Sequence, residues 1–222
     1  MTEHLFPIWL SLKCSLLSSV INLPWGIFWG WILARKKFPG KIIVQTFLYF
    51  PLVLPPVLTG YILLSLFSKH SFLGGMFYQL FHTQFVLDWK GVVLAATVVA
   101  SPFMIQSIKE AMENVDVRLE MVARSLGADA WKAFWTITIP LCQPGILAGF
   151  FLTFARSMGE FGATIMVAGN IPSKTQTIPS AIYSKVLLGQ EKEMFPLIVA
   201  AVVFAYVGLG LSYYYKQKKI IS

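Results

Sequence analysis

The sequence predicts an all-α membrane protein, a bundle of five transmembrane helices formed by one domain over residues 8–217. Of its 222 residues, 56% are hydrophobic and only 13% are charged, which leaves too much apolar surface for a domain surrounded by water. A bilayer core about 30 Å thick is crossed by roughly 20 apolar residues in a helix. Several uncharged stretches of this chain reach that length.

Four stretches without Asp, Glu, Lys or Arg are long enough to cross a membrane: 14–34, 42–68, 91–108 and 194–215. A fifth begins at Leu141, is interrupted by Arg156 and Glu160, and ends near Asn170. Residues 71–87 are uncharged as well, but they are few and include adjacent glycines and several polar side chains. We therefore expect five spans, with residues 71–87 outside the membrane.

The distribution of Lys and Arg predicts the orientation, because basic residues near helix ends are retained on the cytoplasmic side. With five spans, one side receives eleven Lys and Arg, in the segments 35–41, 109–132 and 216–219, and the other side receives five. We expect an external N-terminus and a cytoplasmic C-terminus. The formal charge of +8 then reflects topology rather than a basic groove, so no nucleic-acid partner is expected.

No residue pattern indicates catalysis, a metal or a cofactor. Cys14 and Cys142 each stand alone in an apolar stretch, which predicts small buried residues rather than a disulfide. No carboxylate or cysteine stands at ligand spacing from any of the three histidines, His4, His70 and His82. The phosphate-binding pattern GxxxxGK[ST] is also missing. An intramembrane enzyme would need a nucleophile with its base or a metal cluster, and we predict neither.

The longest polar segment, residues 109–140, carries charges of both signs. Val115, Leu119, Val122 and Leu126 recur at helical spacing and predict a short helix with an apolar stripe. Gly127 breaks that helix, and residues 128–138 resume helical character before Pro140 marks the entry to the membrane. Two interpretations remain open: an amphipathic helix anchored at the membrane surface, or a docking helix for a soluble partner.

The same loop resembles the EAA loop of ABC importer permeases. Glu120, Ala123 and Gly127, followed by Pro140 after an apolar residue, match that pattern. Met121 and Val122 stand where the family has alanine, a departure that keeps the face apolar. The resemblance implies that Glu120, Ala123, Leu126, Gly127 and Pro140 belong to a cytoplasmic coupling loop.

The resemblance covers most of residues 10–215. The sequence is similar to the molybdate permeases in five segments: 38–41, 51–57, 115–120, 154–164 and 177–183. Sulfate and thiosulfate permeases share residues 159–163, and they are the alternative. The resemblance implies the type I ABC importer fold and import of molybdate, or a similar oxyanion such as tungstate. It further implies a bacterial inner-membrane homodimer in lipid, two cytoplasmic ATP-binding subunits that hydrolyse ATP, and an extracytoplasmic oxyanion-binding protein.

Polar and helix-breaking residues inside the spans are candidates for an anion path or gate. Arg156 is expected near the bilayer centre, where Glu160 at i+4 can neutralise it. Either the two form only an ion pair that fixes helix packing, or Arg156 adds positive potential to the path and Thr164 a hydroxyl donor. Pro55 and Pro56 either kink the second span or line the path.

Overall fold

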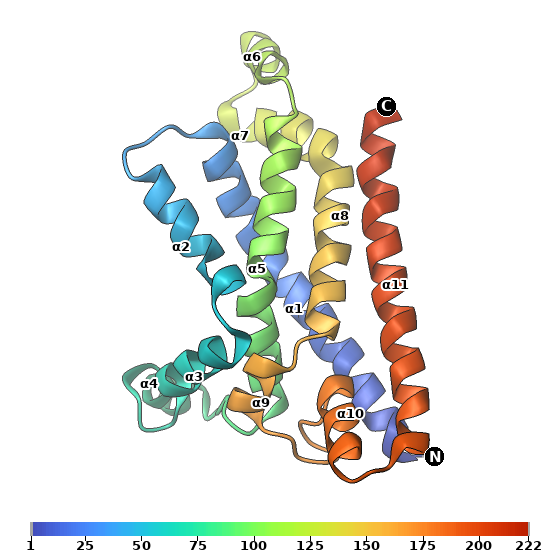
Figure 1. Ribbon diagram of the computed structural model, residues 1–222. Coiled ribbons are helices and arrows are strands. Elements are labelled where there is room, and N and C mark those ends of the chain that lie inside the picture. Colours follow the sequence, from blue (N-terminus) through green and yellow to red (C-terminus); the bar gives the residue numbers. More distant parts are fainter. Residues whose placement is uncertain (1, 222) are drawn as a thin grey trace.

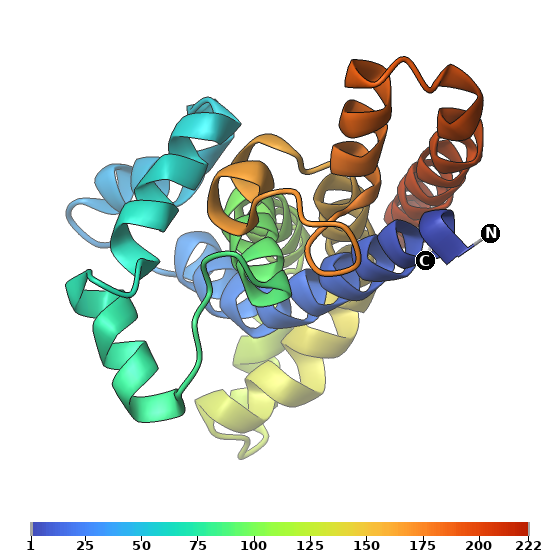
Figure 2. The same cartoon turned by 90° about the horizontal axis from the view of Figure 1, so that it is seen from below.

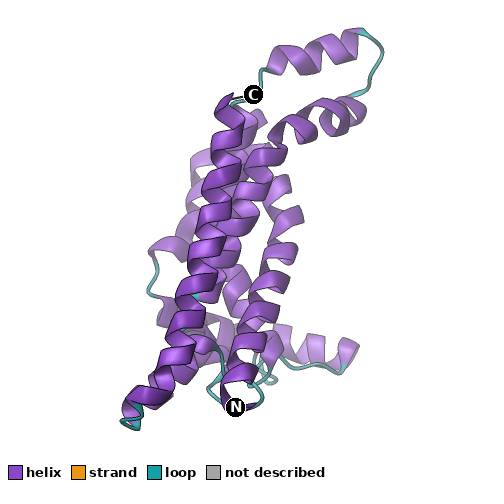
Figure 3. Cartoon of the chain, turned by 90° about the vertical axis from the view of Figure 1, so that its right-hand side faces the viewer, coloured by secondary structure: helices purple, strands orange, loops and turns teal. Residues whose placement is uncertain are grey.

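The computed structural model describes residues 2–221, and this part of the chain contains helices and loops but no strand (Figures 1 and 3). The predicted all-α class is confirmed. The elements in chain order are α1 (Thr2–Arg35), α2 (Lys41–Val53), α3 (Pro56–Phe67), α4 (Phe72–Phe81), α5 (Trp89–Glu113), α6 (Val117–Ser125), α7 (Ala130–Ala133), the π-helical turn η1 (Phe134–Thr138), α8 (Ile139–Met158), α9 (Gly162–Ala168), α10 (Ile178–Leu187) and α11 (Glu191–Ile221).

Four long helices form the body of the bundle. Helix α1 packs against α5 and α8, and α8 packs against both α5 and α11. Each of these four, counting α7, η1 and α8 as one continuous helix, is long and apolar enough to cross a membrane, and α2 with α3 would make a fifth crossing. Several extend beyond the predicted spans, because a helix does not end where its charges begin.

The second predicted span is not one helix, because α2 and α3 are bent by 110° at their junction. The expected kink at Pro55 and Pro56 is instead a complete break. A proline forces the residue before it into an extended conformation, and Leu54 and Pro55 both precede a proline, with ψ of 140° and 129°. Pro55 and Pro56 also have no N–H to donate to the preceding turn. Two consecutive extended residues therefore redirect the chain.

The fifth predicted span is also interrupted. Helix α8 ends at Met158, and the chain turns through Gly159, a poor helix former, before α9 begins at Gly162. The N–H of Glu160 donates to the carbonyl of Ser157, three residues back, at 3.2 Å. Arg156 thus lies in the last turn of α8 rather than in the middle of a helix, and Glu160 lies in the break.

The two ends of the bundle carry different elements. Helices α3, α4, α9 and α10 gather at the end where α1 begins, whereas α6 and the end of α11 lie at the opposite end (Figure 1). We call the latter the loop end. The segment 71–87 contributes α4, whose 10 residues extend only about 15 Å. It is too short to span a membrane, as the sequence predicts.

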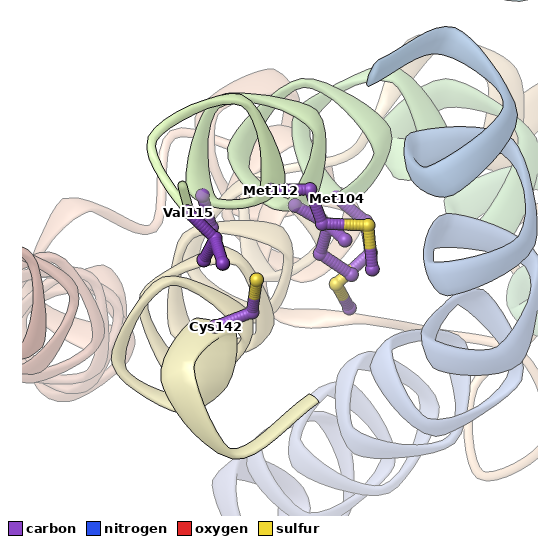
Figure 4. Close-up of a cluster of buried hydrophobic side chains, with 6 residues drawn as sticks. Met104, Met112, Val115 and Cys142 are labelled. Atoms are coloured by element: carbon purple, nitrogen blue, oxygen red, sulfur yellow. The ribbon is translucent and has the colours of Figure 1, made fainter. Parts of the chain in front are cut away.

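The core near the loop end combines sulfur-containing and small side chains. Met104, Met112, Val115 and Cys142 pack together between α5 and α8 (Figure 4). The two helices approach closely because a Cβ on Gly145 would lie only 2.3 Å from that of Ala111. This close packing holds together the end of α5 and the start of α8, between which the loop lies.

Candidate functional site

The predicted coupling loop forms a helix, a tight turn and a second helix. Asp116 caps α6 by accepting a hydrogen bond from the N–H of Arg118 at 2.9 Å. At the other end Gly127 has a φ of +94°, its N–H donates to the carbonyl of Arg124, and the N–H of Ala128 donates to the carbonyl of Ala123. This pair of bonds is a Schellman motif, which favours glycine because of the positive φ. The turn predicted at Gly127 is present.

The apolar stripe of α6 faces outward. Val115, just before the helix, is buried, but Leu119, Val122 and Leu126 are exposed, Leu126 to 84%. No residue of α6 itself is buried. Large exposed apolar side chains in one patch are typical of an interaction surface. The exposed stripe fits both interpretations of the loop, docking on a soluble partner and anchoring at the membrane surface.

The second half of the loop continues into the membrane helix. Asp129 accepts a hydrogen bond from the N–H of Lys132 and begins α7, and η1 then joins α7 to α8 without a break. Pro140 lies in the first turn of α8, where its missing N–H interrupts the ladder just after the π-helical turn. Trp131 in α7 and Trp135 in η1 remain exposed, at the surface where the sequence places the membrane interface.

Glu120 points into the protein, away from the exposed face of α6. Its Oε1 lies 3.1 Å from Nη2 of Arg35, and the hydroxyl of Thr138 donates to the same oxygen at 2.7 Å. The same Arg35 nitrogen donates to the carbonyl of Val115 at 3.0 Å. Sequence reasoning counted Arg35 only as a topology charge and missed Thr138. No local spacing could have found these partners, since they come from separate helices.

The two helix breaks meet at the end of the bundle opposite the loop (Figure 2). A Cβ on Gly162 would lie 2.9 Å from that of Pro56, and a Cβ on Gly60 would lie 2.7 Å from the Cα of Ala163. The N-termini of α3 and α9, the ends that carry partial positive charge, therefore lie side by side. Pro55 and Pro56 are exposed, whereas Thr164 is buried on α9.

Arg156 and Glu160 form the predicted ion pair, with 2.8 Å between Nη2 and Oε2. The carboxylate of Glu160 is buried, and its Oε1 also accepts the N–H of Ala163 at 2.9 Å. Glu160 thus accepts a hydrogen bond from the first turn of α9, and its negative charge balances the partial positive charge at the N-terminus of that helix. The Arg156 side chain remains 29% exposed. The structure brings Arg156, Glu160 and the Pro56 region together, while the coupling-loop residues lie at the other end.

The described residues contain no group of three or more His, Cys, Asp or Glu side chains that could hold a metal ion. The described residues form a bundle of helices long and apolar enough to cross a membrane. An exposed helix and turn lie at one end of this bundle, and two broken helices are in contact at the other. These features are those of a multi-spanning helical membrane protein.

The chain belongs to the family described as the binding-protein-dependent transport system inner membrane component, whose model matches residues 25–220. It is 47% identical over 204 residues to the molybdenum transport system permease protein ModB of Escherichia coli (strain K12), covering 91% of this chain and 89% of that protein. It is 32% identical over 209 residues to the sulfate transport system permease protein CysW of Synechocystis sp., covering 94% of this chain and 75% of that one.

Among solved structures, the fold is similar to a chain in the inward-facing MetNI methionine ABC transporter, with a TM-score of 0.72 and 16% identity over 100% of this chain and 96% of that chain. This likeness confirms the fold predicted from the sequence, that of an ABC importer permease. It leaves the transported compound to be inferred from the closer relatives.

Proposed function

We propose that this chain is the permease subunit of an ABC importer that carries molybdate, or a similar oxyanion such as tungstate, across the bacterial inner membrane. The observation that carries the proposal is the near-full-length similarity to a molybdenum permease, which is higher than the similarity to a sulfate permease. Residues 8–217 act as one transmembrane domain that includes the loop 109–140.

The energy for import comes from partner subunits. The sequence lacks a phosphate-binding loop, so ATP hydrolysis belongs to two cytoplasmic ATP-binding subunits that receive the exposed face of α6 on each of two permease copies. An external oxyanion-binding protein delivers the anion. A difference in the affinity of these partners for two permease conformations would bias the transporter between its inward-facing and outward-facing states.

The orientation follows from this assignment. Because α6 and the end of α11 lie at the same end of the bundle (Figure 1), docking of cytoplasmic ATPases on α6 places the C-terminal end of α11 in the cytoplasm. The start of α1 then lies outside. This is the orientation that the distribution of Lys and Arg predicts.

The anion path passes the two helix breaks. A dianion with four acceptor oxygens requires hydrogen-bond donors and positive potential along its route, and intramembrane sites of this kind are often built from the ends of broken helices. Pro56 begins α3 directly after Pro55, Thr164 belongs to α9, and Glu160 lies in the break before α9. Arg156 supplies the positive charge from its exposed side, while Glu160 reduces the cost of holding that charge in the membrane.

Uptake of radiolabelled molybdate by cells that express the whole transport system tests this function. We expect excess tungstate to suppress the uptake strongly, and the same excess of sulfate or thiosulfate to have little effect. A matched strain whose ATP-binding subunit cannot hydrolyse ATP controls for diffusion and other carriers. Suppression by sulfate equal to that by tungstate would replace molybdate with the sulfate or thiosulfate alternative.

A further inference from the structure

The helix that faces the partner has little to hold it in place. Helix α6 buries none of its own residues, and its main packing partners are the short elements α7 and η1. Its two arginines and its large apolar residues are exposed, whereas Glu120 is half-buried. Some other interaction must determine where α6 stands relative to the membrane helices, since an isolated helix of 9 residues is only marginally stable in water.

Arg35 provides that interaction. It lies in the last turn of α1, and its Nη2 contacts both the carbonyl of Val115, in the link between α5 and α6, and Oε1 of Glu120 on α6. Thr138 in η1 donates to the same Oε1. One carboxylate oxygen therefore joins three elements: α1, α6 and the π-helical turn that leads into α8.

The ion pair between Arg35 and Glu120 is well placed to transmit movement between α6 and α1. The Arg35 and Glu120 side chains are 11% and 23% exposed, so water screens them less than a surface ion pair. The planar guanidinium reaches the carbonyl and the carboxylate from a fixed geometry, which an ammonium group on a flexible chain does not reproduce. A π-helical turn directly beside the contact is a point at which a helix can bend.

We propose that Arg35 is the positioning residue of the coupling helix: through Glu120 and Thr138 it ties α6 to α1 and to the α7–η1–α8 helix, so that movement of α6 on the ATPase moves the membrane helices. This inference rests on the proposed function, because it assumes that α6 docks on an ATPase. It assigns the carboxylate of Glu120 to the permease's own fold, whereas the exposed stripe of α6 provides the docking surface.

The test uses the complete transporter in proteoliposomes and measures ATP hydrolysed per molybdate ion imported. We expect Arg35→Gln to raise this ratio roughly fivefold or more, the lower end of the usual range for coupling between two sites. Arg35→Lys should give an intermediate ratio, and Thr138→Val a smaller rise. Arg35→Glu combined with Glu120→Arg should recover part of the wild-type ratio, because it restores the attraction between the two positions.

Lys109→Gln is the matched control. Lys109 pairs with Glu113 at 3.5 Å near the same end of the bundle. Both residues belong to α5, so this ion pair does not link α6 to another helix. The ratio should therefore stay at the wild-type value. A role of Arg35 in general stability alone would lower the amount of assembled transporter and leave the ratio unchanged.

A second readout does not depend on transport. A nitroxide on Ser125→Cys, an exposed position on α6, should become more mobile in the nucleotide-free transporter when Arg35 is replaced by Gln, and not when Lys109 is. Unchanged label mobility, or an unchanged ratio in Arg35→Gln, would overturn the proposal. Failure of the charge exchange to recover any of the ratio in an assembled transporter would assign Glu120 to another partner. If the wild-type transporter itself imports no molybdate, the proposed function fails, and the label still tests Arg35.

Discussion

The contact between α3 and α9 gives a sharp test of how the two helix breaks are held together. A Cβ on Gly60 would lie 2.7 Å from the Cα of Ala163, 2.8 Å from its carbonyl oxygen and 2.8 Å from the Cβ of Met166. Two of these are backbone atoms, which cannot rotate away as the end of a long side chain can. Gly60→Ala must therefore push α3 and α9 apart.

The expected change in stability of the Gly60→Ala variant follows from two opposing effects. Forcing an extra methyl group into a packed contact costs about 1–3 kcal/mol, while alanine in a helix interior gains up to ~1 kcal/mol over glycine. Gly210 in α11 is the matched control, because a Cβ there meets no atom within 4 Å. Relative to Gly210→Ala, the Gly60→Ala variant should lose about 1–3 kcal/mol, or roughly 2–12 °C in Tm for a chain of this length.

Thermal unfolding of the purified transporter in detergent measures the difference, and molybdate uptake of the same variants shows whether the α3–α9 contact matters for transport. We expect Gly210→Ala to keep full uptake and Gly60→Ala to lose part of it. A Gly60→Ala variant that melts at or above the temperature of Gly210→Ala would show that the two broken helices are not in close contact.

Three further outcomes are expected. A cysteine at Arg124 should be protected from an impermeant maleimide in intact cells and one at Lys174 should react, because these exposed positions lie at opposite ends of the bundle; labelling at 124 would reverse the orientation. Gly127→Pro should insert normally but abolish most coupled uptake, since proline cannot adopt a φ of +94° or donate to the carbonyl of Arg124. Gly127→Ala should reduce the stability of the turn by only about 1–2 kcal/mol. Normal uptake by the proline variant would contradict a docking role. Arg156→Met with Glu160→Gln keeps an acceptor for the start of α9, so it should assemble but import slowly, with Arg156→Lys retaining part of the rate; wild-type uptake by the double variant would remove the pair from the anion path.

The sequence by itself determined the class of protein and the local form of the loop. Transfer of apolar side chains from water depends on composition along a single stretch, so the membrane helices were predictable without knowing their neighbours. The turn at Gly127 was predictable for a similar reason, since the need for glycine arises within a few consecutive residues. The motif around Glu120 and Gly127 then indicated the family.

Two spans that the sequence predicts as continuous are broken in the structure, although the proline and glycine residues at the breaks are visible in the sequence. The pair Pro55 and Pro56 was expected to kink or line a continuous span, but two successive extended residues separate α2 from α3. The fifth span was expected to run from Leu141 to near Asn170, yet its first helix ends at Met158. In both places composition predicted an apolar stretch of the right length but not the break within it, because hydrophobicity does not report whether each backbone N–H finds a partner four residues earlier.

Only the tertiary structure decided which distant residues meet. Nothing near Glu120 in the sequence points to Arg35 or Thr138, and nothing near Gly162 points to Pro56. Contacts of this kind depend on where helices cross and how closely their backbones approach, which small residues such as Gly60, Gly145 and Gly162 set through packing between segments far apart in the chain. Helix formation is local in its hydrogen bonds, but the pairing of charges and helix ends is a property of the assembled bundle.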